Sequence, residues 1–221
     1  MSIGQMCRKI LGPKYFKYAG KAYRGIFVNV KIVIQSFPEM PAGSHLLDIG
    51  GGDGELINHL KERFPDIKIT MIDIAGAMGS LLEEKYRKDV RILPATSIAQ
   101  YDERYGATSP KVDFILISDV VHHIVPSQRR GFFSDLSKLM NENTQVIFKD
   151  VEPGYFISRL SYWGDKYVSG DKTVELTSKK EITGLMKENF PNIDWYETDL
   201  FAKNRPNFSL VFSLRKSASV Q

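Results

Sequence analysis

The chain has 221 residues, of which 43% are hydrophobic, 25% charged and 11% aromatic, and its formal net charge is +4. This composition can bury a full core, which excludes an intrinsically disordered chain and a disulfide-stapled mini-protein. Cys7 is the only cysteine, so no internal disulfide can form, and no Cys/His cluster has zinc-site spacing. We therefore predict no metal site and a cytoplasmic location.

The N-terminal segment, residues 1–44, is basic and rich in aromatic residues. Seven basic residues precede the first acid, Glu39. The longest apolar stretch, Ile26–Phe37, is interrupted by polar residues and is far shorter than the roughly 20 residues of a membrane-spanning helix. A signal peptide is rejected because cleavage after Ser44 would cut into the strand that begins at His45. We expect a helical arm that covers a ligand site, holds an anionic substrate, or contacts a membrane surface or nucleic acid; a solvated helix face is the alternative.

Short apolar runs alternate with helix-like segments over residues 45–151, which is typical of βαβ units with a parallel sheet. The predicted strands are His45–Ile49, Lys68–Asp73, Val90–Leu93, Val112–Ser118 and Gln145–Val151. The predicted helices are Glu55–Phe64, Ala77–Arg87 and Gln128–Met140, the last with Ser127 as its N-cap.

After residue 151 the pattern changes. Residues 152–176 are irregular and aromatic-rich, and Ser178 with Glu181 predicts a capping box for a helix ending near Phe190. Two further strands, Ile193–Thr198 and Phe208–Leu214, should pair as an antiparallel hairpin. We predict an α/β fold: a doubly wound, mostly parallel seven-stranded sheet with an antiparallel C-terminal hairpin and an N-terminal helical arm. The arm is 1–44, the main domain 45–215 with a substrate-lid insertion at 152–176, and the tail 216–221.

The most informative segment is a glycine loop between the first predicted strand and helix. An acid is followed by glycines at every second position: Asp48, Gly50, Gly52 and Gly54. A dinucleotide fingerprint would need glycine at position 55, which is Glu, and no Walker lysine follows. A carboxylate at the strand end suits a positively charged ligand rather than a phosphate; a tight turn without ligand is the alternative.

This loop resembles the acid-x-Gly-x-Gly-x-Gly motif of the class I (Rossmann-like) S-adenosylmethionine-dependent methyltransferases, and of their small-molecule branch in particular. The resemblance covers about Leu46 to Leu214. It implies that the loop holds the amino-acid end of S-adenosyl-L-methionine, which leaves as S-adenosyl-L-homocysteine after methyl transfer.

Two further segments agree with a nucleoside ligand. Asp73 ends the second strand 21 residues after Gly52, where a carboxylate grips a ribose diol. By the resemblance, Ile74 covers one adenine face, and Thr96 and Ser97 follow the third strand beside the adenine. Relatives commonly place an acid where this chain has Thr96, which leaves the contact to the adenine amino group open.

The segment after the fourth strand, Ser118 to Ile124, resembles the His-His-hydrophobic motif of the small-molecule branch. Ser118 and Asp119 are assigned to the cofactor and His122 and His123 to catalysis, since a neutral imidazole can remove the acceptor proton. The phosphoethanolamine branch favours His123, with a partner tyrosine from the N-terminal arm: Tyr15, Tyr18 or Tyr23. Alternatively, both histidines pack and bond locally.

Aromatic side chains of the 152–176 segment and of the arm are the candidate substrate residues. In the segment they are Tyr155, Phe156, Tyr162 and Trp163, or else these rings belong to a packed helix. We expect a small-molecule acceptor rather than nucleic acid, methylated on a hydroxyl or carboxyl oxygen. Methylation of nitrogen or carbon, a non-catalytic cofactor-binding module and an NAD-dependent oxidoreductase are the alternatives; a homodimer and weak contact with a membrane surface are left open.

Overall fold

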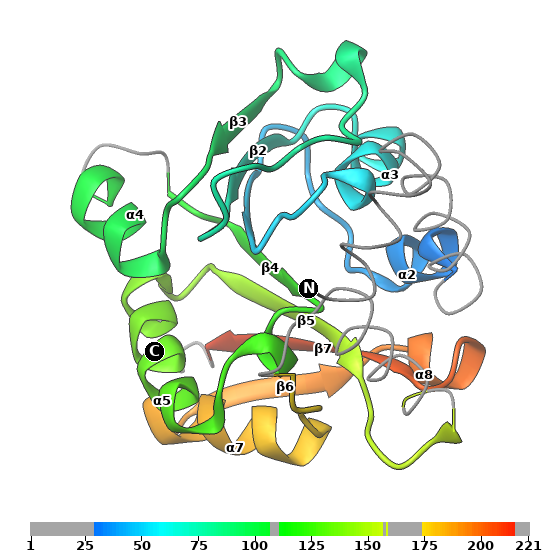
Figure 1. The fold of residues 1–221 in the computed structure, drawn as a ribbon, viewed down its shortest axis with the longest axis vertical. Helices are drawn as coiled ribbons and strands as arrows, with labels where there is room; N and C mark the ends of the chain where they lie inside the picture. The colour runs from blue at the N-terminus through cyan, green and yellow to red at the C-terminus, as the bar shows by residue number, and fades with distance from the viewer. Residues whose placement is uncertain (1–28, 107–110, 157, 159–173, 215–221) are drawn as a thin grey trace, which may run out of the picture.

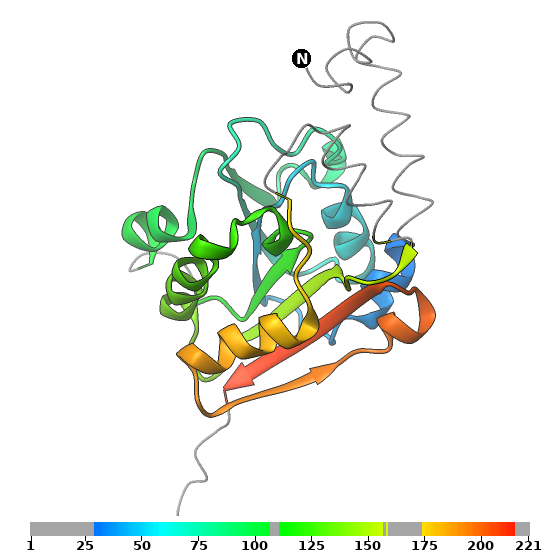
Figure 2. The ribbon, with the colours of Figure 1, turned by 60° about the horizontal axis from the view of Figure 1, so that its bottom comes forward.

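The computed structural model describes residues 29–106, 111–156, 158 and 174–214. A seven-stranded sheet forms its centre, in the order β3-β2-β1-β4-β5-β7-β6. Helices cover both faces of this sheet, as Figures 1 and 2 show from two directions. The predicted doubly wound, mostly parallel seven-stranded sheet is confirmed.

Five parallel strands occupy one side and the middle of the sheet. They are β1 (His45–Ile49), β2 (Lys68–Ile72), β3 (Val90–Leu93), β4 (Phe114–Ser118) and β5 (Gln145–Val151). β1 lies between β2 and β4, with Asp48 opposite Met71 on one side and Leu116 on the other. Every residue of β1 is buried. A strand covered on both faces needs a nearly continuous apolar run, and this is what its sequence shows.

Two hydrophobic clusters hold the helical layers against the sheet. One cluster joins α4 (Ile98–Tyr105), α5 (Pro126–Leu139) and α7 (Lys179–Asn189) to one face of the strands. The other joins α2 (Val30–Ser36) and α3 (Glu55–Arg63) to the opposite face. Leu47 belongs to the first cluster and its neighbour Leu46 to the second, because successive strand side chains point to opposite faces.

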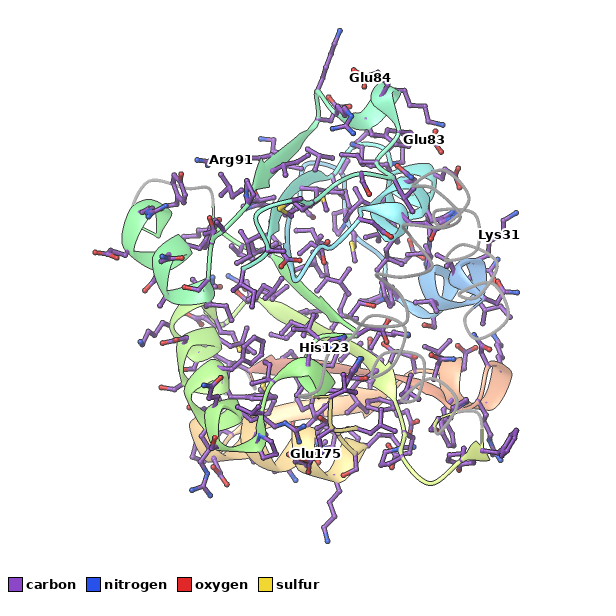
Figure 3. All side chains as sticks on the ribbon, viewed as in Figure 1. Lys31, Glu83, Glu84, Arg91, His123 and Glu175 are labelled. Carbon is purple, nitrogen blue, oxygen red and sulfur yellow. The ribbon has the colours of Figure 1, made fainter. Side chains whose placement is uncertain are left out.

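The described part of the predicted N-terminal arm contains one helix, α2. Arg63 of α3 anchors it by donating hydrogen bonds to the backbone carbonyls of Ile34 and Phe37. Of the seven basic residues of this segment, Lys31 is described, and it is exposed and points away from the body in Figure 3. Residues 1–28 lie outside the described part.

The C-terminal edge of the sheet is antiparallel, as predicted. β6 (Ile193–Glu197) and β7 (Asn207–Leu214) pair antiparallel, and the short helix α8 (Leu200–Lys203) lies between them in the chain. β7 also pairs antiparallel with β5, so the last strand of the chain inserts between β5 and β6. Among the described residues, no helix combines the length and the hydropathy required to cross a membrane.

The helix predicted for Ala77–Arg87 is wrong. Only a 3₁₀ turn, η1 (Glu84–Tyr86), forms there. Gly79 has a φ of +70°, and the amides of Gly79 and Leu81 donate to the carbonyls of Gly52 and Asp53, both at 2.8 Å. The segment therefore supports the glycine loop with hydrogen bonds that a helix would have used internally.

Two helix starts also differ from the sequence prediction. α5 begins at Pro126, with Val125 rather than Ser127 as its N-cap, because proline is well suited to a first helical position. α4 was not predicted, although Ser97 and Gln100 form a capping box at its start.

The helix predicted after Ser178 is confirmed as α7, but of the predicted capping box only the Ser178 cap forms, because the Glu181 carboxylate binds a buried arginine of α5. The Ser178 hydroxyl accepts a hydrogen bond from the Glu181 amide, while the Glu181 carboxylate pairs with Arg129 at 2.6 Å. Arg129 also donates to the backbone carbonyls of Ile124 at 3.0 Å and Glu175 at 2.6 Å. One side chain thus joins α5, α7 and the loop that follows β4.

We expect Arg129→Met to lower the free energy of unfolding by about 2–4 kcal/mol, because it removes charge-assisted hydrogen bonds to two carbonyls and a partly exposed carboxylate. Arg130→Met is the matched control: Arg130 pairs with Glu188 on the same helix α7 but is 78% exposed. It should change stability by less than about 0.5 kcal/mol. Urea denaturation of both variants measures the difference, and equal midpoints would contradict the role given to Arg129.

Candidate functional site

The glycine loop turns sharply between β1 and α3 at the carboxyl edge of the sheet. The amides of Gly50 and Gly51 donate to the carbonyl of Ile72 at 2.8 and 3.2 Å, which ties the loop to β2. Gly50 has a φ of +76°, and a Cβ there would overlap the side chain of Val120. Gly52 has a φ of +51°, and a Cβ there would meet only the Gly50 carbonyl, at 3.8 Å. The first glycine is therefore required by packing, and the second borders open space.

Asp48 ends β1 beneath this loop and is almost completely buried. Burial, and secondarily the negative charge of Asp73, raises the pKa of Asp48 to about 7. A cation bound nearby would favour the ionised form of this carboxylate. The predicted role of Asp48 as a receptor for positive charge stays a prediction, and its burial and raised pKa are the features that such a role requires.

Asp73 follows β2 directly, and the loops on either side orient its carboxylate. One oxygen accepts a hydrogen bond from the Gly52 amide at 3.0 Å and the other from the Ala75 amide at 2.8 Å. Each carboxylate oxygen has more than one lone pair, so both can still accept a hydroxyl hydrogen. The next residue, Ile74, is 82% exposed at the rim.

The segment after β3 is held mostly by its own hydrogen bonds. The Thr96 hydroxyl donates to the Pro94 carbonyl at 3.0 Å, and the Thr96 amide donates to the Asp73 carbonyl at 2.8 Å. The Ser97 hydroxyl accepts from the Gln100 amide at the start of α4. Both residues lie on the cavity wall with their hydroxyls engaged in the turn.

A buried lysine that was not among the predicted site residues lies beside Asp119. Lys149 of β5 is 1% exposed, and its ammonium donates to both oxygens of Asp119 at 2.7 Å. Desolvation raises the pKa of Asp119, but the Lys149 and His122 charges and the bonds from Lys149 and Ser118 outweigh it and lower that pKa. Asp119 also has a φ of +57°, a strained conformation for a residue with a side chain. The sequence feature that could have indicated Lys149 is the Lys149-Asp150 pair at the carboxyl end of an apolar strand.

The two histidines of the η2 turn (Val121–His123) have different surroundings. His122 is buried, and its Nδ1 lies 2.6 Å from the Oδ1 of Asp150. His123 is exposed and lines the cavity; Figure 3 shows it near the centre of the view, at the carboxyl edge of the sheet. The two rings lie 4.2 Å apart between centroids. A buried histidine–carboxylate pair thus lies against the ring of the histidine that lines the cavity.

One cavity of about 920 Å³ joins these groups. Ten of the predicted site residues line it: Asp48, Gly50, Gly52, Asp73, Ile74, Thr96, Ser97, Ser118, Asp119 and His123. Gly54 lies behind the loop, where its Cβ would contact Leu82 at 3.2 Å. The rest of the wall comes from Val30 and Val33 of α2 and from one face of α5. The sequence analysis did not assign these residues to the site, because their apolar spacing indicates only a helix that packs on the sheet.

The predicted aromatic lid is only partly described. Tyr155 and Phe156 are 38% and 74% exposed, and the Tyr155 ring packs edge-on against Phe201, 5.9 Å away. Neither is among the described residues that line the cavity. Tyr15, Tyr18, Tyr23, Tyr162 and Trp163 lie outside the described residues.

Within the described residues, Asp119, His122 and Asp150 bring potential metal ligands within 4.8 Å of one another. The Lys149 ammonium already binds both oxygens of Asp119. It supplies the positive charge that a metal ion would bring, so this group is better described as a buried charge network.

Residues 47–146 match the family model described as a methyltransferase domain. The malonyl-[acyl-carrier protein] O-methyltransferase of Acetivibrio thermocellus is 24% identical over 177 residues, which cover 77% of this chain and 60% of that protein. The chain therefore spans about three fifths of the length of this curated relative.

Solved structures share the fold at low sequence identity. Human N-acetylserotonin methyltransferase, crystallised with S-adenosylmethionine, superposes with a TM-score of 0.64 at 13% identity, covering 88% of this chain and 54% of that one. An O-methyltransferase family 2 protein from Planctomyces limnophilus, in complex with apigenin, superposes with a TM-score of 0.65 at 16% identity. The match covers 90% of this chain and 61% of that one.

We expect Asp119→Ala to lower the free energy of unfolding by about 2–3 kcal/mol, because it leaves the Lys149 ammonium buried without its counter-charge. The double variant Asp119→Ala/Lys149→Met should recover most of this loss, since no charge is then left unpaired. A double-mutant cycle by chemical denaturation measures the coupling. Additive effects of the two substitutions would show that the pair does not stabilise the fold.

Proposed function

Because the chain belongs to the class I S-adenosylmethionine-dependent methyltransferases, we propose that it transfers a methyl group from S-adenosylmethionine to an oxygen atom of a small molecule. S-adenosylmethionine is the cofactor of this family, and S-adenosylhomocysteine is the product derived from it. One observation carries the proposal: the glycine loop, Asp48, Asp73 and His123 line a single cavity at the carboxyl edge of the sheet.

The charges and spaces of the cavity fit this cofactor from end to end. Asp48, buried with a pKa of about 7, would face the ammonium group of the zwitterionic amino-acid end, next to the sulfonium. The open space at Gly52 admits a ligand close to the backbone. Asp73, with both oxygens fixed by amides, would accept the two ribose hydroxyls, and exposed Ile74 would cover a face of the adenine.

The cofactor, when bound, supplies a methyl group activated by attachment to a positively charged sulfur. Held by the glycine loop, Asp48 and Asp73, it would supply this methyl group to a lone pair of the acceptor oxygen, and the electrons of the broken C–S bond would remain on the sulfur. The protein has to align these atoms and keep water away, and the walls of the cavity provide the alignment.

His123 is the group proposed to take the proton of the acceptor hydroxyl. Of the two adjacent histidines it is the one that lines the cavity, and a base must reach the proton that it removes. His122, buried against Asp150, would support the ring of His123 from behind. A carboxylate acceptor would already lack its proton and would need no base.

The acceptor side of the cavity favours a small, partly apolar molecule. Val30 and Val33 of α2 and Ile124, which follows the η2 turn, are apolar residues of its lining. The relatives support an oxygen acceptor: one is named a malonyl-[acyl-carrier protein] O-methyltransferase, and another is an O-methyltransferase family 2 protein crystallised with apigenin. An oxygen of a small organic molecule is therefore the proposed methyl acceptor.

We expect the affinity for S-adenosylmethionine to rise with pH between about 5.5 and 7.5 and then to level off. The free-state pKa of Asp48 is about 7, and a cationic ligand favours the ionised carboxylate, so below pH 7 binding must first release a proton. Titration calorimetry over this range measures the effect. Asp48→Asn should bind more weakly and with a flatter pH dependence, and a parent affinity that is independent of pH would contradict the assignment.

Incubation with isotope-labelled S-adenosylmethionine and fractionated small molecules of a cell extract tests the activity itself. The parent should label at least one small molecule and release S-adenosylhomocysteine. His123→Ala should lower the rate by roughly 10²–10⁴-fold with nearly unchanged cofactor affinity, and the rate of the parent should fall at acidic pH as the imidazole is protonated. Cofactor binding without labelling in any pool would instead indicate a non-catalytic module.

His122→Ala serves as the comparison in the same assay. If His123 is the base, this variant should lose less activity and keep the acidic limb of the pH–rate profile. If His122→Ala instead loses more activity than His123→Ala, His122 with its partner Asp150 would be the base.

A further inference from the structure

One face of α5 forms a wall of the cavity that the functional assignment has not used. Gln128, Gly131, Phe132 and Asp135 line the cavity and are spaced three, four and seven residues from the first. This spacing places all four side chains on one side of a helix. The wall therefore runs along α5 for about two turns.

Gly131 gives this wall a recess that the protein itself does not fill. It lies inside the helix, where glycine costs roughly 0.5–1 kcal/mol relative to alanine. A Cβ at this position would meet no described atom within 4 Å. The missing side chain thus leaves room on the cavity side rather than relieving a contact within the protein.

Asp135 lies beside the start of α4. The pKa of Lys138 is raised first by its hydrogen bond to Asp135 and also by the charge of Asp102 on α4, so these three side chains are close together. α4 and α5 lie against the same face of the sheet and contact each other; Figure 1 shows them as neighbours. Ile98 lies one turn before Asp102 in α4, and Asp135 lies about one turn before Lys138 in α5. Both Ile98 and Asp135 line the cavity.

Asp73, the proposed ribose ligand, is close to this end of the cavity, because the amide of Thr96, two residues before Ile98, donates to the Asp73 carbonyl at 2.8 Å. A purine base that carries an amino group brings two hydrogen-bond donors, which need acceptors once they leave water. The turn fixes the Thr96 hydroxyl, which donates to Pro94, and the Ser97 hydroxyl, which accepts from Gln100. Each keeps only an uncharged acceptor, which is weaker than a carboxylate. The carboxylate of Asp135 keeps acceptor capacity, because its partially exposed ion pair with Lys138 uses one oxygen.

We propose that Asp135 accepts a hydrogen bond from the exocyclic amino group of the cofactor's adenine, with Gly131 making room for the ring and Phe132 packing against it. The inference rests on the proposed function, since it takes the ligand to be an adenosine derivative. It makes Asp135 the residue that distinguishes adenine from a 6-oxo purine. A carbonyl oxygen at that position would face a carboxylate and repel it instead of donating to it.

Titration calorimetry with S-adenosylhomocysteine and its 6-oxo analogue, S-inosylhomocysteine, tests the assignment. The parent should bind the adenine compound more tightly by roughly 10- to 100-fold. Asp135→Ala should weaken binding of the adenine compound and should not weaken binding of the analogue, which loses a repulsive neighbour, so that the two affinities converge. The substitution lies on the helix surface, and its melting temperature without ligand verifies that the fold is intact.

Two control variants separate this role from a structural one. Lys138→Ala removes the ion-pair partner but keeps the acceptor, so it should preserve the preference for adenine. Gly131→Leu should weaken both ligands alike by filling the recess. If Asp135→Ala keeps the parent's preference while the parent binds S-adenosylhomocysteine, the role of Asp135 is overturned and the proposed function stands. If the parent binds neither compound, the proposed function itself fails.

Discussion

The convergence of parallel strand ends at one edge of the sheet is the constraint on which the site depends. β1 and β4 are neighbours, but the helices that follow them pack on opposite faces, so a crevice opens between them. Asp48, Asp73 and Asp119 come from the ends of three different strands and reach this crevice together. None of them could be close to another without the right-handed crossovers of the fold.

The three carboxylates of the crevice differ in how their charge is compensated. Asp119 has the buried ammonium of Lys149, and Asp73 has two backbone amides. Asp48 has burial and the repulsion of Asp73, which together move its pKa to about 7. Because this pKa lies near neutral pH, a bound cation can change the charge state of Asp48.

The sequence predicted those strands well whose apolar residues form one uninterrupted local pattern. β1 and β5 have the predicted boundaries, because a strand buried on both faces needs an apolar run that is visible in the sequence. The Ala77–Arg87 segment had helix-forming residues but lost the helix, because its amides bond to the glycine loop more than 25 residues earlier. Lys149 was missed because its counter-charge, Asp119, lies 30 residues away.

The sequence by itself determined the fold class, the glycine loop and the acids at the ends of β1 and β2, because strand periodicity and turn chemistry are local properties. The tertiary structure decided which of two adjacent histidines faces the cavity. His122 is drawn inward by Asp150, which lies 28 residues further along the chain, and its neighbour His123 is left on the cavity wall. It also decided that α5 supplies a wall of the site, since that face is defined only once α4 and α5 pack together. Contacts between distant parts of the chain make these choices, and no local pattern encodes them.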